Sequence, residues 1–200
     1  LADDRVTVLD PAAGTLSFIT ESVKLAIKEY TSRFGIGAKN KFVKEHILRD
    51  FYAFELMVAP YTIGHIKFAF TLEEEGYTLA DDERPKFYLT NTLEMKTLEK
   101  TNLPLMSAIS EESHLAEQVK KEIPILAIIG NPPYSGISSN TNEWTEKLLK
   151  TDVDGVQSYY MVDDKPLGER KVMLQDDYVK FIRFAQWKIA QSGEGIIGFI

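Results

Sequence analysis

The run Asn131-Pro132-Pro133-Tyr134 combines residue types that suit chemistry at a planar amino nitrogen. An amino group conjugated to a ring is a poor nucleophile until its nitrogen becomes pyramidal and its two hydrogens leave the ring plane. The side-chain oxygen of Asn131 and the carbonyl of Pro132 can accept those hydrogens, an interaction stronger in the transition state than in the ground state. Two successive prolines make the turn rigid, and the ring of Tyr134 can stack on a flat substrate.

The position of this run favours a catalytic role over its plain alternative, a rigid Asn-Pro turn that closes a strand. The apolar stretch 125–129 and Gly130 come directly before it. Open α/β sheets bind their ligands at the carboxyl ends of strands, which is where this turn would lie. We therefore predict that Asn131, Pro132, Pro133 and Tyr134 form a catalytic motif.

A second segment, residues 10–14, follows the apolar run 6–9 and precedes a helical pattern. Small residues and a glycine let the backbone approach a nucleotide-like ligand closely. Taken alone the signal is weak, because the segment is not the G-x-G-x-x-G fingerprint. The expected ligand contacts here are Asp10, Pro11, Ala12 and Gly14.

Polar residues also follow two further expected strands. Glu55 closes the run 52–54, and its carboxylate can accept two hydrogen bonds from a ribose diol. Asn91 follows the run 87–89, where a polar side chain would reach the adenine edge of the same ligand. A solvated acid and a plain loop asparagine are the competing interpretations of these two positions.

These four elements, in this order, resemble the S-adenosylmethionine-dependent N6-adenine DNA methyltransferases of the amino-methylating class. Residues 10–18 look like the family's cofactor motif, and residues 53–56 (Ala-Phe-Glu-Leu) like its ribose-binding acid. Residues 90–93 (Thr-Asn-Thr-Leu) are similar to a motif that usually reads Asp-Thr-Leu, and residues 131–134 to the catalytic tetrapeptide. Residues 165–170 and 174–187 look like a segment of large single-chain restriction–modification enzymes, including the type ISP group.

The resemblance covers nearly the whole chain and implies direct methyl transfer from S-adenosylmethionine to N6 of a flipped-out adenine. It implies a Rossmann-like class I methyltransferase fold. It adds Leu56 and Thr92 to the residues expected to hold the cofactor. Two positions depart from the family: Leu16 stands where many members have glycine, and Asn91 where most have aspartate.

The pattern along the chain independently predicts an α/β fold, with helices on both faces of a mostly parallel twisted sheet. Turn-forming residues mark 135–168 as a long surface loop with little regular structure, inserted after the catalytic motif. The expected strands are residues 6–9, 52–54, 87–89, 125–129 and 196–200. The expected helices are residues 17–33, 41–50, 59–75, 111–121 and about 169–191, with Gly193 as the last helix stop.

A length of 200 residues with 44% apolar content suits one domain, spanning residues 1–200. The chain begins just before one expected strand and stops inside another. We therefore expect a piece of a multidomain restriction–modification enzyme, incomplete at both ends.

The charge balance bears on nucleic-acid binding. Thirty acidic and 23 basic residues leave a net charge of -7, which argues against gripping a phosphate backbone by charge alone. We expect duplex DNA to be held through a recognition domain missing here, and to bind this chain alone only weakly. Six basic residues nevertheless fall close together in sequence: Lys24, Lys28, Arg33, Lys39, Lys41 and Lys44.

Other classes of site are disfavoured. The chain has no cysteine, no secretory signal and no apolar run long enough to span a membrane, so we expect a cytoplasmic protein. Its three histidines, His46, His65 and His114, show no ligand spacing, so no metal site is expected. Lys120 and Lys121 are expected to be solvated at a helix end.

Two alternative functions stay open. The tetrapeptide serves any planar amino nitrogen, so a protein glutamine amide or an RNA base amine is an alternative substrate. A non-catalytic cofactor-binding scaffold is the other alternative: the intact tetrapeptide speaks against it, whereas the unusual residues Leu16 and Asn91 leave it open.

Overall fold

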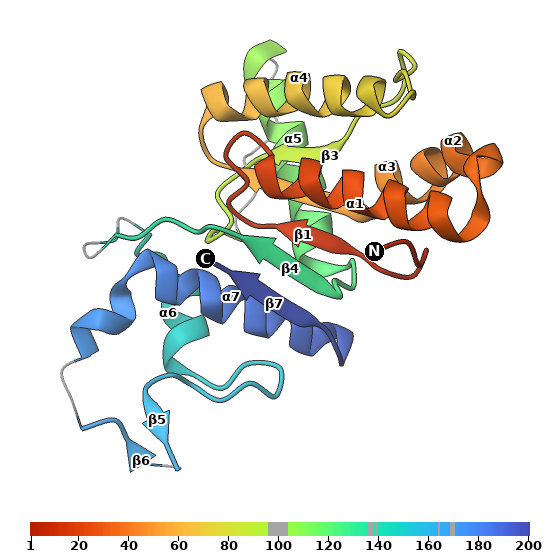
Figure 1. Ribbon diagram of the computed structural model, residues 1–200. Coiled ribbons are helices and arrows are strands. Elements are labelled where there is room, and N and C mark those ends of the chain that lie inside the picture. The colour runs from red at the N-terminus through yellow and green to blue at the C-terminus, as the bar shows by residue number, and fades with distance from the viewer. Residues whose placement is uncertain (96–103, 136–137, 139, 164, 169–170) are drawn as a thin grey trace.

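The computed structural model describes residues 1–95, 104–135, 138, 140–163, 165–168 and 171–200. In this part of the chain five strands form one sheet in the order β3-β2-β1-β4-β7, and every neighbouring pair is parallel (Figure 1). The strands are β1 (Val8–Asp10), β2 (Phe51–Glu55), β3 (Lys86–Leu89), β4 (Ala127–Gly130) and β7 (Ile196–Phe199). All five expected strands are confirmed, with ends shifted by one or two residues.

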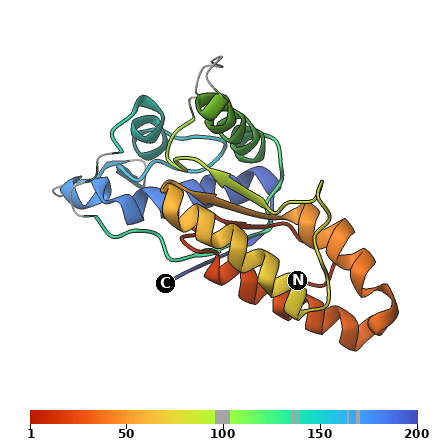
Figure 2. The same ribbon diagram turned by 90° about the horizontal axis from the view of Figure 1, so that it is seen from above.

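Helices cover both faces of this sheet, which confirms the expected α/β fold of Rossmann-like type (Figure 2). One layer consists of α1 (Ser17–Phe34), α2 (Lys39–Phe42), α3 (Leu48–Asp50) and α4 (Val58–Glu74). The other consists of α5 (Pro104–Lys121), α6 (Glu143–Lys150) and α7 (Asp177–Ser192). A π-helical stretch, Val43–Ile47, joins α2 to α3 without a break. Two 3₁₀ helices, Ile36–Ala38 and Lys171–Gln175, and a strand pair, β5 (Met161–Val162) and β6 (Lys165–Pro166), complete the elements.

The strands divide the core into two parts because successive side chains point to opposite faces of a sheet. Val8 and Ala53 are buried against the α1–α4 layer, whereas Leu9 and Phe54 are buried against the α5–α7 layer. Burial on both faces explains why these strands are nearly continuous apolar runs.

The order of the strands creates a switch point at the carboxyl edge of the sheet. The chain steps from β1 outward to β2 and β3, then returns to place β4 on the other side of β1. The connections leave the carboxyl ends of β1 and β4 in opposite directions, and ligands bind at such a switch point in open α/β sheets. The segments after β1 and β4 are those predicted to carry the chemistry.

The prediction of an irregular loop over 135–168 is wrong for α6, the helix Glu143–Lys150. Asn142 begins this helix with a capping box, in which its side chain accepts the Thr145 N–H and its own N–H donates to Thr145 Oγ1. Acids in the first turn and lysines in the last turn suit the helix dipole. The turn-forming composition of the flanking residues hid this helix signal.

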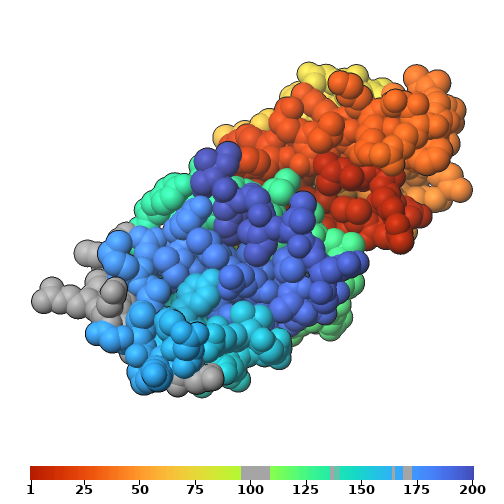
Figure 3. All heavy atoms as spheres, turned by 60° about the horizontal axis from the view of Figure 1, so that its bottom comes forward, coloured from red at the N-terminus to blue at the C-terminus, as the bar shows by residue number. Residues whose placement is uncertain are grey.

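The last helix also differs from expectation at its start. α7 begins at Asp177, where Asp176 accepts the Tyr178 N–H at 2.8 Å, and Gly193 ends it in the left-handed conformation. The expected first residues of this helix, Glu169 and Arg170, lie outside the described residues. The strand β7 that follows lies at the edge of the sheet and at the surface, with Ile196 largely exposed (Figure 3).

No helix in the described ranges combines the length and the apolar character that crossing a membrane requires.

Candidate active site

A cavity of about 420 Å³ lies at the carboxyl ends of the strands. Its walls come from the segments that follow β1, β2, β3 and β4, together with the start of α7. Nine residues that the sequence singles out line it: Pro11, Ala12, Gly14, Glu55, Leu56, Asn91, Thr92, Asn131 and Pro133. The remaining three, Asp10, Pro132 and Tyr134, lie beside it in the same segments.

Asp10 lies fully buried at the tip of β1. Its Oδ1 accepts the Ala12 N–H at 3.1 Å, while its Oδ2 has no hydrogen-bond partner among the described residues. Burial, with a smaller contribution from the charge of Glu55, raises the pKa of Asp10 to about 7. A buried carboxyl oxygen without a partner beside a cavity fits a site that receives a ligand.

Gly130 makes this arrangement possible. A Cβ at position 130 would lie 2.6 Å from Asp10 Oδ1, which is too close for any side chain. The glycine before the catalytic motif therefore lets β4 and the Asp10 carboxyl lie side by side. The sequence contains the signal, because an isolated glycine in a strand often marks a close approach.

The segment after β1 turns sharply before α1 begins. Gly14 and Leu16 both have positive φ, 53° and 63°. Such a conformation costs a non-glycine residue about 1–2 kcal/mol. Leu16 is fully buried, and a Cβ added to Gly64 of α4 would lie 3.1 Å from its Cγ. Leu16 therefore adopts a glycine-like backbone and offsets the strain by filling the space beside Gly64.

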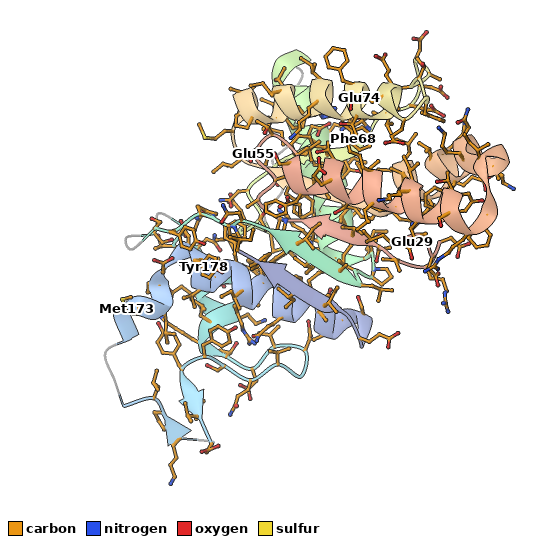
Figure 4. All side chains as sticks on the ribbon, in the orientation of Figure 1. Glu29, Glu55, Phe68, Glu74, Met173 and Tyr178 are labelled. Carbon is orange, nitrogen blue, oxygen red and sulfur yellow. The ribbon has the colours of Figure 1, made fainter. Side chains whose placement is uncertain are left out.

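Glu55 joins the segments after β1 and β2. Its Oε2 accepts the Gly14 N–H at 2.8 Å, and its Oε1 accepts the Met57 N–H at 2.7 Å. Each carboxylate oxygen retains capacity for a second hydrogen bond, so two acceptor positions remain for a diol. Figure 4 shows Glu55 on the side of the molecule toward which the tips of β4 and β7 point.

The segment after β3 is held by a lysine that was expected to be solvated. Lys120 is only 2% exposed, and its Nζ donates to Asn91 O at 2.7 Å, Glu94 O at 2.9 Å and Thr90 Oγ1 at 3.2 Å. Burial lowers the pKa of Lys120 to about 7. The expectation was wrong because Lys120 follows the buried Ala116 by one helical turn, and that spacing was the available signal.

Thr92 completes the contact between the segments after β3 and β1. Its hydroxyl donates to the carbonyl of Pro11 at 2.5 Å, and its side chain is buried. Asn91 accepts the Leu93 N–H through Oδ1 at 3.0 Å and donates through Nδ2 to Asn140 at 2.9 Å. Thr92 and Asn91, both predicted ligand contacts, therefore also hold segments of the cavity wall together.

The predicted catalytic motif, residues 131–134, follows β4 and contributes Asn131 and Pro133 to the lining of the cavity. Asn131 is exposed to the cavity and Pro132 is buried beneath it. Tyr134 stacks on Tyr178 of α7, with ring centroids 4.8 Å apart and planes 16° apart, and its hydroxyl donates to Ile200 O at 2.6 Å. The sequence places Tyr178 on the apolar face of a helix and does not indicate this partnership.

The six clustered basic residues lie away from the cavity. α1 begins beside the strand tips and runs toward the opposite edge of the sheet, where its last turns lie (Figure 1). Lys24 pairs with Glu21 and Glu74, Arg33 with Glu29, Lys41 with Glu45, and Lys44 with Glu83. These charges are largely matched by acids and do not form a basic face at the site.

Among the described residues no group of three or more His, Asp or Glu side chains is placed to hold a metal.

Comparison with known proteins gives matches among solved structures. No family model matches the chain, and no curated protein sequence matches it. The chain superposes along its whole length on a nuclease-deletion mutant of the Type ISP restriction-modification enzyme LlaGI in complex with a DNA substrate mimic, with TM-score 0.74 and 29% identity. It also matches the ATP-dependent Type ISP restriction-modification enzyme LlaBIII bound to DNA, with TM-score 0.75 and 24% identity over the whole chain.

A DrdV–DNA complex shares the fold, with TM-score 0.66 and 23% identity over the whole chain. The matched region spans 16% of the LlaGI chain, 13% of the LlaBIII chain and 17% of the DrdV complex chain. The chain is therefore similar, over its whole length, to one segment of much larger chains, among them that of the restriction–modification enzyme LlaGI.

Proposed function

We propose that this chain is the methyltransferase domain of a restriction–modification enzyme, which transfers a methyl group from S-adenosylmethionine to N6 of adenine in DNA. One observation carries the proposal: Asn131 and Pro133 line the same cavity as Pro11, Glu55 and Asn91. The similarity to restriction–modification enzymes supports it from outside the site.

The residues on the cavity wall fit the cofactor. Glu55 retains two acceptor positions for the ribose hydroxyls, and the segment of Asn91 and Thr92 offers hydrogen-bonding groups to the adenine. The partnerless Oδ2 of Asp10 places an acceptor beside Pro11 and Ala12. When bound, S-adenosylmethionine supplies an electrophilic methyl group on a cationic sulfonium.

The catalytic motif acts on the target amino group. Asn131 Oδ1 and the Pro132 carbonyl accept its two hydrogens and draw them out of the ring plane, which exposes the nitrogen lone pair. Tyr134, the last residue of the motif, and Tyr178 stack into an aromatic surface against which a base rotated out of the duplex can stack.

DNA is the substrate that the comparisons favour, because the similar LlaGI mutant was solved in complex with a DNA substrate mimic. A net charge of -7 and the ion-paired lysines of α1 and α2 favour weak DNA binding by this chain alone. We infer that most of the grip on duplex DNA comes from a separate recognition domain.

The test measures transfer of radiolabel from S-adenosylmethionine to DNA by the full-length protein that contains this chain, followed by digestion to nucleosides. The proposal expects label in N6-methyladenosine. Asn131→Ala should lower the rate by about 10²-fold or more, as expected on losing one transition-state hydrogen-bond partner, with cofactor affinity nearly unchanged. Glu55→Ala should chiefly weaken the cofactor, measured by calorimetry.

Label in protein or RNA instead of DNA would mean that protein or RNA is the substrate. No label in any polymer, together with cofactor binding, would leave a cofactor-binding scaffold. Equal loss of melting temperature in Asn131→Ala and Glu55→Ala, with every other property falling in parallel, would contradict the assigned roles.

A further inference from the structure

Side-chain hydrogen bonds join three segments of the cavity wall that are distant in sequence. Asn91 Nδ2 donates to Asn140 Oδ1 at 2.9 Å, and Asn140 Nδ2 donates to Asp177 Oδ1 at 3.0 Å. The first residue follows β3, the second follows the catalytic motif after β4, and the third begins α7. All three line the cavity. We call this connection the amide bridge.

The Asp177 carboxylate, at one end of the bridge, decides which way the side-chain amides of Asn140 and Asn91 face. A carboxylate only accepts, so Asn140 must turn its NH₂ group toward Asp177 and its oxygen toward Asn91. Asn91 must then present its own NH₂ group to Asn140, which leaves its Oδ1 for the Leu93 N–H at 3.0 Å. In this one arrangement each of the two amides donates one N–H within the bridge and accepts one hydrogen bond through its oxygen.

Further contacts hold Asn140 and the carboxylate in place. Asp177 is buried in the first turn of α7, where the helix dipole favours a negative charge. Ser138 Oγ donates to Asp177 Oδ1 at 2.5 Å. Lys180 Nζ donates to Ser138 Oγ and to Asn140 O, both at 2.7 Å. The bridge is therefore fixed by both the side chain and the main chain of Asn140.

Two of the three segments that the bridge joins, those after β3 and after β4, are not connected directly by the sheet. β3 and β4 are separated by β2 and β1, so the segments that follow them are not neighbours through strand pairing. Transfer chemistry requires its groups to be held to within a fraction of an ångström, and a displacement of 1 Å can cost about 10²-fold. The amide bridge fixes these segments relative to each other, which strand pairing does not do.

We propose that Asn140 is a positioning residue, which holds the segment after β3 in register with the start of α7, where Tyr178 stacks on Tyr134 of the catalytic motif. The inference rests on the proposed methyl-transfer function and adds a residue to it. Asn140 acts through Asn91 and Asp177 and does not take part in the chemistry itself.

The test uses Asn140→Asp in the full-length protein, because aspartate has the shape of asparagine but cannot donate to Asp177. The kcat for methyl transfer should fall at least about tenfold. The KM for S-adenosylmethionine should change less than about threefold, since Lys120 and Thr92 still hold the segment after β3.

The matched control is the double variant Asn140→Asp with Asp177→Asn. It exchanges donor and acceptor, so that the new amide at position 177 would donate to the new carboxylate at position 140. That carboxylate would still accept from Asn91. Ser138 Oγ and Asn140 Nδ2 donate to the same oxygen of Asp177, so in the double variant the Ser138 hydroxyl would turn to accept from the new NH₂ group. The kcat should return to within about threefold of wild type. A double variant as slow as Asn140→Asp, or a wild-type kcat in Asn140→Asp, would overturn the proposal.

Hydrogen exchange provides a readout that does not depend on activity. The Leu93 amide, which donates to Asn91 Oδ1, should exchange faster in Asn140→Asp and return toward the wild-type rate in the double variant. Unchanged exchange in both variants would contradict the bridge. A wild-type protein that methylates nothing would overturn the proposed function, while the exchange pattern would still decide whether the bridge exists.

Discussion

The helices on the two faces of the sheet are attached by different interactions. The α1–α4 layer packs through an apolar cluster that includes Ile27, Phe68 and Phe87. The α5–α7 layer has an apolar cluster as well, but among the described residues the buried Lys and Arg side chains all belong to this layer. They are Lys120, Lys180, Arg183 and Lys188.

Each of these four cations donates to main-chain carbonyls at the ends of elements or in loops. Arg183 bonds Leu148 O at 2.7 Å and Val156 O at 2.9 Å, and Lys188 bonds Lys120 O at 2.7 Å. A cation has several donors and can satisfy several carbonyls of irregular chain at once. The α1–α4 layer thus stabilises the sheet, whereas the α5–α7 layer also fixes the segments that shape the cavity.

The largest effect should come from removing an apolar side chain in the α1–α4 layer. Phe68→Ala should lower the free energy of unfolding by about 3–5 kcal/mol, because it leaves a cavity in the core. Urea unfolding measures the change. Phe70→Ala on the same helix is the control. Phe70 is 60% exposed, so this substitution should change the free energy of unfolding by no more than about 0.5 kcal/mol. Equal losses in both variants would contradict the burial of this face.

A smaller loss is expected from removing a buried cation in the α5–α7 layer. Arg183→Met should lower the free energy of unfolding by about 1–3 kcal/mol, because it leaves the carbonyls of Leu148 and Val156 without their donor. The same urea titration applies, with the exposed Arg33→Met as control. A variant more stable than wild type would mean that burying the charge costs more than its hydrogen bonds return.

The buried lysine beside the cavity should make stability depend on pH. Burial lowers the pKa of Lys120 to about 7 in the folded protein, against 10.5 ordinarily. Between these values the unfolded chain binds more protons, so stability rises with pH by at most about 1.4 kcal/mol per unit. The free energy of unfolding of wild type relative to Lys120→Met should therefore increase from pH 7 to pH 10. A flat difference would show that Lys120 is solvated.

The smallest effect concerns the start of α6. Asn142→Ala removes the cap and should cost about 1 kcal/mol. Asn142→Asp keeps the oxygen that accepts the Thr145 N–H but loses the donor to Leu93 O, so it should cost less if the cap dominates. Thermal unfolding distinguishes the two variants. A greater loss in the aspartate variant would assign the main role to the Leu93 contact.

The sequence by itself determined the elements that depend on local pattern. Apolar runs predicted the five strands, and Gly193 predicted the end of α7. The order of the motifs also predicted that the segments after four strands meet at one edge, because parallel strands share a carboxyl edge. These features follow from the burial of side chains at fixed spacing, which a sequence records directly.

The tertiary structure alone decided which polar groups meet. Nothing local to Gly14 indicates that its N–H donates to Glu55, and nothing local to Asn140 indicates that its amide lies between Asn91 and Asp177. The spacing from Ala116 could place Lys120 on the buried face of α5, but only the fold decides that the segment after β3 supplies its three acceptors. Hydrogen bonds are short and directional, so their partners depend on how distant segments are placed by the sheet, and a periodic pattern along one segment carries no record of that placement.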